Sequence, residues 1–179
     1  MAQCGNLSFA LAETRLFRPG GAVLGVLQDQ EMSFANLKIH FVWSTKSREK
    51  LLHPSFRNEL FKHIGGITKK RKHILLAAGG IEDHLHLLVG FHQSSSISDY
   101  VRDVKSNSSI WIKENQTNLK GFAWQTKYGA FSVSQSSVDE VKKYICNQEE
   151  HHKKMTYQQE FLILLAKHGI SFDQKYVWE

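Results

Sequence analysis

The chain has 179 residues, of which 41% are apolar and 22% are charged, and 23 lysine and arginine residues against 17 acidic residues give it a net charge of +6. This length and apolar content predict one globular domain and exclude a disordered chain. Two cysteines cannot make a disulfide framework, and no apolar run approaches the roughly 20 residues of a membrane-spanning helix. We therefore expect a basic protein of the cytoplasm, whose charge serves either nucleic-acid binding or solubility alone.

The first 31 residues differ in character from the rest of the chain. They hold two basic and three acidic side chains, a net charge of −1, whereas residues 32–179 hold 21 basic and 14 acidic side chains and all ten histidines. No helical or strand period is sustained before Met32. We therefore predict a poorly ordered extension over residues 1–31 and one functional domain over residues 32–179, and we hypothesise that Met32 is the authentic start.

The first half of this domain contains three predicted strands and one helix. The predicted strands are residues 37–43, 73–78 and 82–91, and the first of them alternates apolar with other residues and has β-branched and aromatic content. Between the first two, His53-Pro54-Ser55 is typical of a helix start, and its apolar stripe runs to Gly65-Gly66. Gly79-Gly80 predicts a tight turn between the second and third strands.

The second half contains one more strand and three helices. Residues 122–125 and 130–133 predict a fourth strand, or a hairpin broken at Tyr128-Gly129. The helical segments begin with Ser96-x-x-Asp99, with Ser137-x-x-Glu140 and near Gln158, and they span residues 96–111, 137–152 and 158–167. The order β-α-β-β-α-β followed by helices predicts an α+β fold. We expect a ferredoxin-like or RRM-like antiparallel sheet with helices on one face and additional C-terminal helices.

The motif His84-Leu85-His86 lies on the third predicted strand. Because side chains on a strand alternate between its two faces, both imidazoles point the same way while the adjacent leucines enter the core. Two imidazoles on one face can bind a divalent cation, and Glu82 on that face is a further candidate, whereas Asp83 points to the other face. Two solvent-facing histidines without a ligand are the alternative, and this motif alone does not separate the two.

The predicted helix over residues 137–152 carries Tyr144 and Gln148 on one flank, at the margin of its buried stripe. A tyrosine hydroxyl is a poor nucleophile because its reference pKa is about 10, but a nearby cation favours the phenolate and polarises a phosphate. Tyr144 as nucleophile, a cation at His84 and His86, and the Gln148 carbonyl as third ligand therefore form a chemically consistent set. Packing at the core edge is the alternative role of Tyr144.

Two longer motifs accompany His84-Leu85-His86 and Tyr144-x-x-x-Gln148. They are Ile39-His40-Phe41-Val42-Trp43-Ser44-Thr45-Lys46 and Trp124-Gln125-x-x-Tyr128-Gly129-Ala130-Phe131-Ser132-Val133-Ser134. In order and spacing, the four motifs resemble those of the single-tyrosine HUH transposases of the insertion-sequence-200-like kind, and of their relatives associated with repetitive extragenic palindromes. The resemblance spans about residues 33–179.

This resemblance implies a metal-dependent transposase that cleaves and rejoins single-stranded DNA. His84 and His86 match the pair that binds Mg²⁺ or Mn²⁺, and Gln148 matches the helical glutamine that completes that site. Tyr144 matches the nucleophile, which leaves a 5′-phosphotyrosine and a free 3′-hydroxyl. Family members recognise DNA hairpins near the element ends and act as homodimers, often with the tyrosine helix of one subunit against the histidine pair of the other.

Basic and aromatic side chains are candidates for DNA contacts. The basic candidates form two groups along the chain, Lys46, Arg48 and Lys50, and Lys69, Lys70, Arg71 and Lys72. Trp43, Trp124 and Tyr128 are candidates for stacking on unpaired bases, although aromatic residues in strands are more often core residues. Tyr128 is also the rival nucleophile, but its Tyr-Gly setting is more typical of a turn. His151 and His152 directly follow the tyrosine helix and are candidates to contact DNA or to support the metal site.

Two other functions are compatible with the same fold. The first is a host role such as processing palindromic repeats without autonomous mobility. The second is a non-catalytic single-stranded nucleic-acid binder, because the ferredoxin-like plan also serves RNA-recognition modules. The central strands have a His-x-His motif where such modules carry an aromatic run, which favours the transposase.

Overall fold

The structure is a computed structural model of the chain, and it describes residues 34–173, 175, 177 and 178. The chain separates into two units, residues 1–35 and 36–179, and all helices and strands that the structure describes belong to the second. The extension predicted over residues 1–31 and the hypothetical start at Met32 lie outside the described residues.

Four antiparallel strands form one sheet. The strands are β1 (Leu37–Ser44), β2 (Ile74–Gly80), β3 (His84–Phe91) and β4 (Gly129–Ser132). Their order across the sheet is β2-β3-β1-β4, which places the first and third strands at the centre. This order confirms the predicted α+β, ferredoxin-like plan, in which the two crossover connections pass through helices.

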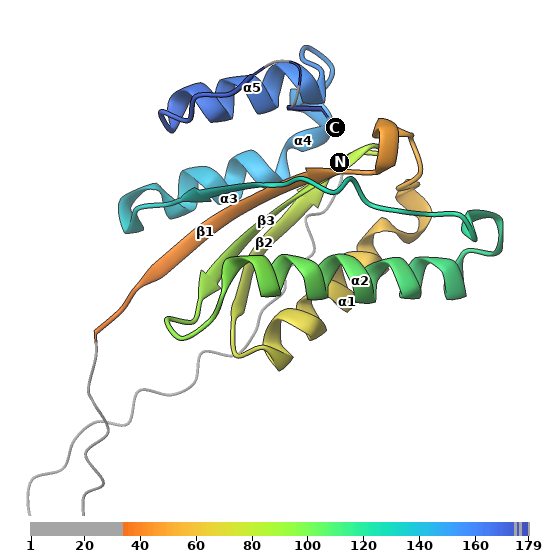
Figure 1. Cartoon of the computed structure of the whole chain (residues 1–179), viewed down its shortest axis with the longest axis horizontal. Helices are drawn as coiled ribbons and strands as arrows, with labels where there is room; N and C mark the ends of the chain where they lie inside the picture. The colour runs from red at the N-terminus through yellow and green to blue at the C-terminus, as the bar shows by residue number, and fades with distance from the viewer. Residues whose placement is uncertain (1–33, 174, 176, 179) are drawn as a thin grey trace, which may run out of the picture. The chain divides into compact units, whose positions relative to one another are not determined.

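Helices cover both faces of the sheet (Figure 1). The crossover helices α1 (Pro54–Lys70) and α2 (Ile97–Asn115) lie together on one face. The later helices, α3 (Val138–Cys146), α4 (Gln148–His151) and α5 (Tyr157–Lys167), lie on the opposite face. Three short 3-10 turns complete the described elements, namely η1 (Lys46–Arg48), η2 (Thr117–Leu119) and η3 (Gln135–Ser137).

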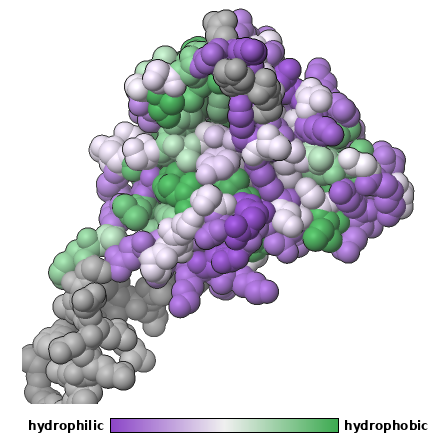
Figure 2. Space-filling view, in the orientation of Figure 1, coloured by the Kyte–Doolittle hydropathy of each residue, from purple (hydrophilic) through white to green (hydrophobic). Residues whose placement is uncertain are grey.

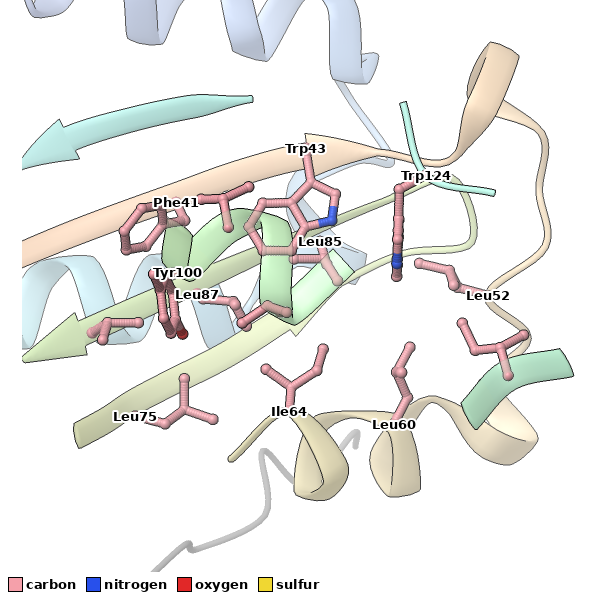
Figure 3. Packing of buried hydrophobic residues seen from close by; sticks show 14 of the residues in the cluster. Phe41, Trp43, Leu52, Leu60, Ile64, Leu75, Leu85, Leu87, Tyr100 and Trp124 are labelled. Carbon is pink, nitrogen blue, oxygen red and sulfur yellow. The ribbon is translucent and has the colours of Figure 1, made fainter. Parts of the chain in front are cut away.

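The main core lies between the sheet and the two crossover helices. Figure 3 shows Trp43 of β1 and Leu87 of β3 on this side, facing Ile64 of α1. Because strand side chains alternate, the residues between them point to the other face, where Val42 packs against α5 and Leu88 packs with α3. The two central strands are therefore buried on both faces, and the α3–α5 face receives every second residue, including both histidines of the His-x-His motif.

Two glycine pairs have roles that differ from the predicted ones. The prediction that α1 ends at Gly65-Gly66 is wrong, because the helix continues to Lys70 and Gly65 is itself buried, with its Cβ position 3.5 Å from Leu75 Cδ2. Tertiary packing here outweighs the low helix propensity of glycine. The predicted turn at Gly79-Gly80 is also wrong, since both residues belong to β2. A Cβ on Gly79 would lie 2.0 Å from the Ile145 carbonyl oxygen, so glycine permits close approach of α3 to the strand.

The remaining boundaries confirm some predictions and correct others. Ser96 caps α2 as predicted, since its side chain accepts a hydrogen bond from the Asp99 N–H. Of the two candidate segments for the fourth strand only the second forms β4, while Trp124 makes an isolated bridge to Thr45. The single helix predicted to reach about His152 is instead two helices, because the non-helical backbone of Asn147 (φ −104°, ψ 24°) separates α3 from α4.

The surface of the described part is predominantly hydrophilic. Figure 2 shows hydrophilic side chains over most of the visible face, with hydrophobic ones in smaller patches between them. Within the described ranges, no helix combines the length and the apolar character needed to cross a membrane.

Candidate active site and metal centre

His84 and His86 are buried beneath the C-terminal helices. Both side chains have 0% exposure, and they point to the sheet face opposite Leu85 and Leu87, which lie in the main core as predicted. The alternative of two solvent-facing histidines is therefore wrong. The alternation of β3 places the imidazoles in a closed, polar cluster against the helices that follow β4.

The Nδ1 atom of each imidazole is engaged by a neighbour, so the Nε2 atoms face into the cluster. His84 Nδ1 lies 2.6 Å from Asp83 Oδ1, and His86 Nδ1 lies 2.9 Å from Nε2 of His40 on β1. A hydrogen on Nδ1 leaves the Nε2 lone pair available to a cation. Glu82 is not part of the cluster, so the expectation that it helps to bind the cation is wrong, and it is Asp83 that contacts His84. The reason is that β3 begins only at His84, so strand alternation does not extend to the two residues before it.

Tyr144 and Gln148 of the same chain lie beside this histidine pair. Gln148 Oε1 is 3.2 Å from His84 Nε2, and the Tyr144 ring centroid is 5.8 Å from that of His86. Gln148 is only 1% exposed, whereas Tyr144 is half-buried. The break at Asn147 turns the chain between the two residues, yet both side chains reach the cluster, so the four predicted site residues meet within one chain.

Glu160 of α5 lies at the centre of the cluster and was not predicted. Its Oε1 atom accepts hydrogen bonds from the Tyr144 hydroxyl and, at 3.1 Å, from Gln148 Nε2. Its Oε2 atom faces three imidazole Nε2 atoms, at 3.1 Å from His152, 3.3 Å from His86 and 3.5 Å from His84. One potential ligand atom from each of His84, His86, His152 and Glu160 lies within 4.8 Å of the others, which makes this cluster a candidate metal centre.

The sequence of α5 contains a signal that points to Glu160. The buried residues of this helix are Tyr157, Glu160, Phe161, Leu164 and Leu165, which repeat at helical spacing. A carboxylate within an otherwise apolar stripe indicates a buried charge that needs partners. Its partners are the β3 histidines, which are distant in sequence, and residues of α3, α4 and the turn after α4, and no local pattern identifies them.

The charges of the cluster shift its pKa values in opposite directions. Burial lowers the pKa of His86, and burial together with the nearby His86 ring lowers that of His40 well below its usual range. Burial alone would raise the pKa of Glu160, but the surrounding histidines outweigh it and hold that pKa well below the usual range. For His152 burial lowers the pKa, but the hydrogen bond and charge of Glu160 outweigh burial, so the net shift is upward.

Tyr144 has a raised pKa, first because of burial and second because of the negative charge of Glu160. With these protein groups around it, the phenol therefore keeps its proton. The side chain needs a compensating positive charge before its oxygen becomes a competent nucleophile.

The two groups of basic residues lie at opposite ends of the sheet. Lys46, Arg48 and Lys50 follow β1, whose last residue pairs with His84, so this group lies at the cluster end. Lys69 to Lys72 precede β2, whose first residue pairs with Gly90, at the far end of β3. The six residue steps along β3 from His84 to Gly90 span roughly 20 Å, so the structure does not bring the two groups together.

The candidate stacking aromatics are mainly core residues. Trp43 and Trp124 are 0% and 7% exposed and pack edge to face in the main core, so their rings do not face solvent. Tyr128 packs against the same core, on the α1–α2 side, with Lys105 Nζ 5.5 Å from its ring centroid. It lies on the sheet face opposite the histidine cluster.

Comparison with known proteins identifies the family. The family model described as Transposase IS200 like matches residues 33–148, more than half of the chain. The chain belongs to this family. The matched segment of this IS200-like transposase contains all four strands, the histidine pair, Tyr144 and Gln148, whereas His152 and Glu160 lie beyond it.

Solved structures resemble this IS200-like transposase. A protein of Deinococcus radiodurans assigned as a transposase has 25% sequence identity and a TM-score of 0.56, over 68% of this chain and 98% of the other. A REP-associated tyrosine transposase bound to a REP hairpin has 16% identity and a TM-score of 0.48, over 63% of this chain and 66% of the other. No curated protein matches the chain.

Proposed function

We propose that this transposase cleaves and rejoins single-stranded DNA at hairpin-marked ends, with Tyr144 as the nucleophile and with Mg²⁺ or Mn²⁺ bound at His84, His86 and Gln148. The observation that carries the proposal is the position of Tyr144, whose ring lies 5.8 Å from that of His86 within the same chain. A tyrosine beside two inward-facing imidazoles can place a nucleophile next to a bound cation, an arrangement suited to metal-assisted phosphoryl transfer.

The cluster residues fit a divalent cation. His86 Nε2 is fully buried and makes no hydrogen bond to any described residue, although Glu160 Oε2 is 3.3 Å away. Burial lowers the pKa of His86, which favours the neutral imidazole that a metal needs. When bound, the cation would polarise the scissile phosphate and favour the tyrosine phenolate.

The remaining steps belong to the chain's own side chains. The Tyr144 oxygen loses its proton and attacks the phosphorus, the bond from phosphorus to the 3′ oxygen breaks, and that oxygen takes up the proton that the phenol released, which leaves a 3′-hydroxyl. Glu160 Oε1 accepts the hydrogen bond of the Tyr144 hydroxyl, so it holds and orients the phenol proton on the path by which that proton leaves. The new phosphotyrosine bond replaces the broken phosphodiester, so rejoining to another 3′-hydroxyl needs no other energy source.

A DNA strand would reach the cluster from the side of Tyr144 and His151. The histidines of β3 are fully buried, whereas Tyr144 is half-buried and the His151 side chain is 30% exposed. Lys46 and Lys50 are exposed at the same end of the sheet and are proposed phosphate contacts, as is the half-buried Arg48. We also propose a homodimer, in which each active site draws Tyr144 and the histidines from one chain.

The test is incubation with a hairpin-bearing single-stranded DNA and Mn²⁺, followed by a denaturing gel. We expect a covalent protein–DNA adduct that disappears in Tyr144→Phe and after chelation of the metal. Tyr128→Phe is the matched control, because it removes the same hydroxyl from the rival tyrosine on the opposite sheet face, and it should form the adduct normally. An adduct that persists in Tyr144→Phe, or that is lost in Tyr128→Phe, would contradict the proposal.

A further inference from the structure

We propose that His152 and Glu160 are additional ligands of the same ion, so that the segment after β4 supplies three of its five ligands, these two and Gln148. The inference rests on the proposed metal site at His84 and His86 and extends it to residues beyond the segment that the family model matches. The site would then offer three imidazole nitrogens, one carboxylate oxygen and the Gln148 amide oxygen.

The spacing of the potential ligand atoms supports a single ion. Ligand atoms about 2.1 Å from a metal lie about 3.0–3.4 Å apart when they are neighbours around it. Glu160 Oε2 lies 3.1, 3.3 and 3.5 Å from the Nε2 atoms of His152, His86 and His84. Gln148 Oε1 lies 2.9 Å from His152 Nε2 and 3.2 Å from His84 Nε2. All five separations lie within 0.1 Å of that range, so the atoms are spaced closely enough to share one coordination shell.

His152 has the same orientation as the two strand histidines. Its Nδ1 donates to the Met155 carbonyl oxygen at 2.7 Å, because a carbonyl can only accept, and its Nε2 points into the cluster. In His84 the Asp83 carboxylate holds Nδ1 in the same way, and in His86 the ring of His40 does so. Three imidazoles with Nδ1 fixed from outside and Nε2 turned inward form the pattern of metal-ligating histidines.

The burial of Glu160 calls for a cation. Its side chain is 2% exposed on the apolar face of α5, and all its ion-pair partners among the described residues are histidines. No described lysine or arginine forms an ion pair with the carboxylate. A divalent ion would neutralise Glu160 and satisfy the otherwise unbonded His86 Nε2 at once.

The donor set predicts which ion the chain prefers. Mg²⁺ favours oxygen ligands and retains several waters, whereas imidazole-rich sites suit transition metals. With three nitrogen donors and two oxygen donors, we expect the DNA-free protein to bind Mn²⁺ more tightly than Mg²⁺. Because Glu160 lies on α5 and the strand histidines on β3, the ion would also tie the C-terminal helix to the sheet.

The test is Mn²⁺ binding to the full chain without DNA, by titration calorimetry and by the electron paramagnetic resonance signal of free Mn²⁺. Loss of a residue that only hydrogen-bonds to a metal ligand typically weakens metal binding about 10- to 100-fold. We expect Glu160→Gln and His152→Gln each to weaken Mn²⁺ binding by at least that factor. Glu150→Gln and His63→Gln are matched controls outside the cluster and should bind Mn²⁺ like the unmodified chain. Circular dichroism checks that each variant is folded.

His84→Ala separates this inference from the proposed function. If His84→Ala abolishes Mn²⁺ binding while Glu160→Gln and His152→Gln bind normally, the additional ligands are overturned and the strand histidine site stands. If His84→Ala also binds normally, the proposed metal site itself is wrong. If Glu160→Gln increases adduct formation with unchanged Mn²⁺ affinity, Glu160 covers the site rather than ligating the ion, and the inference is overturned.

Discussion

Each imidazole of the cluster is held from outside by a different kind of group. Asp83 offers a carboxylate, His40 a ring nitrogen and Met155 a backbone carbonyl. Among the three, only Asp83 carries a full charge, and a carboxylate on Nδ1 both orients a histidine and increases the basicity of its Nε2. The affinity of the proposed metal site should therefore depend on Asp83 more than on either neutral partner.

Asp83→Asn is the substitution that tests this dependence. It keeps the size of the side chain but replaces the carboxylate on His84 Nδ1 with a neutral amide, so we expect Mn²⁺ affinity to fall by about 10- to 100-fold. Titration calorimetry measures the change. Glu82→Gln is the matched control, since it removes a charge one residue earlier from a side chain outside the cluster, and it should leave the affinity unchanged. Equal effects of the two variants would attribute the loss to general negative charge near the site.

Sequence motifs indicated four residues of the cluster, His152 was predicted only as a residue that contacts DNA or supports the metal site, and Glu160 was not predicted. His84, His86, Tyr144 and Gln148 lie in two short motifs whose spacing on a strand and on a helical segment predicts a shared direction. Glu160 acquires its position only because α5 packs back onto the sheet, against Val42 of β1 and Phe131 of β4, and apolar packing rather than a motif sets that contact. The lone carboxylate in the apolar stripe of α5 was the single local signal.

At the scale of elements, the position of Tyr144 depends on how closely α3 approaches β2. The helix lies against Gly79, where a Cβ would lie 2.0 Å from the carbonyl oxygen of Ile145, the residue after Tyr144. Backbone atoms cannot move aside as a flexible side chain can, so any larger residue at this position must displace the helix. Because Gly79 has no Cβ, α3 lies close enough to β2 for Tyr144 to reach the cluster.

Gly79→Ala should therefore displace α3 and separate Tyr144 from the histidines. We expect a loss of about 1–3 kcal/mol in the free energy of unfolding, measured by urea denaturation, together with a lower yield of the DNA adduct. Gly66→Ala is the matched control, because a Cβ there meets no atom within 4 Å in the middle of α1. That variant should gain about 0.5–1 kcal/mol and keep its adduct yield. Similar behaviour of the two variants would show that α3 does not need this close approach.

The fold was predictable where sequence period decides an element and not where packing does. Strands β1 and β3 and the start of α2 follow from alternation and from a capping residue, and the order of elements indicated the sheet topology. A Gly-Gly pair in the sequence, in contrast, is compatible with a turn, with a strand beneath a helix and with the inside of a helix. Gly65-Gly66 and Gly79-Gly80 therefore received wrong roles, since their true roles depend on partners far along the chain.

For the molecule as a whole, the two basic groups and the cluster suggest a path for the DNA. Lys46 and Lys50 lie at the cluster end of the sheet, and Lys69 and Lys70 lie at the end of α1, roughly 20 Å away along the strands. That separation corresponds to about six base pairs of duplex, at 3.4 Å each. We therefore expect the first group to contact the single strand beside the cluster and the second to contact the hairpin stem.

Double variants that each remove two lysines separate these contributions. Lys46→Ala/Lys50→Ala should weaken binding to both a plain single strand and a hairpin, whereas Lys69→Ala/Lys70→Ala should weaken binding to the hairpin alone. Each lost phosphate contact should reduce the slope of log K against log salt by about 0.7 for the single strand and about 0.9 for the duplex stem. Fluorescence anisotropy over a series of salt concentrations measures both quantities.

The matched control for both pairs is Lys62→Ala/Lys120→Ala, which removes the same charge. Neither lysine belongs to the two basic groups. Lys62 pairs with Glu59, and Lys120 donates to the Lys113 carbonyl oxygen. Its binding should fall only slightly, because charges beyond a Debye length of about 8–10 Å are largely screened in physiological salt. If all three double variants weakened both DNAs to the same extent, the excess charge of the chain would act as a diffuse field, and no defined path for the hairpin would remain.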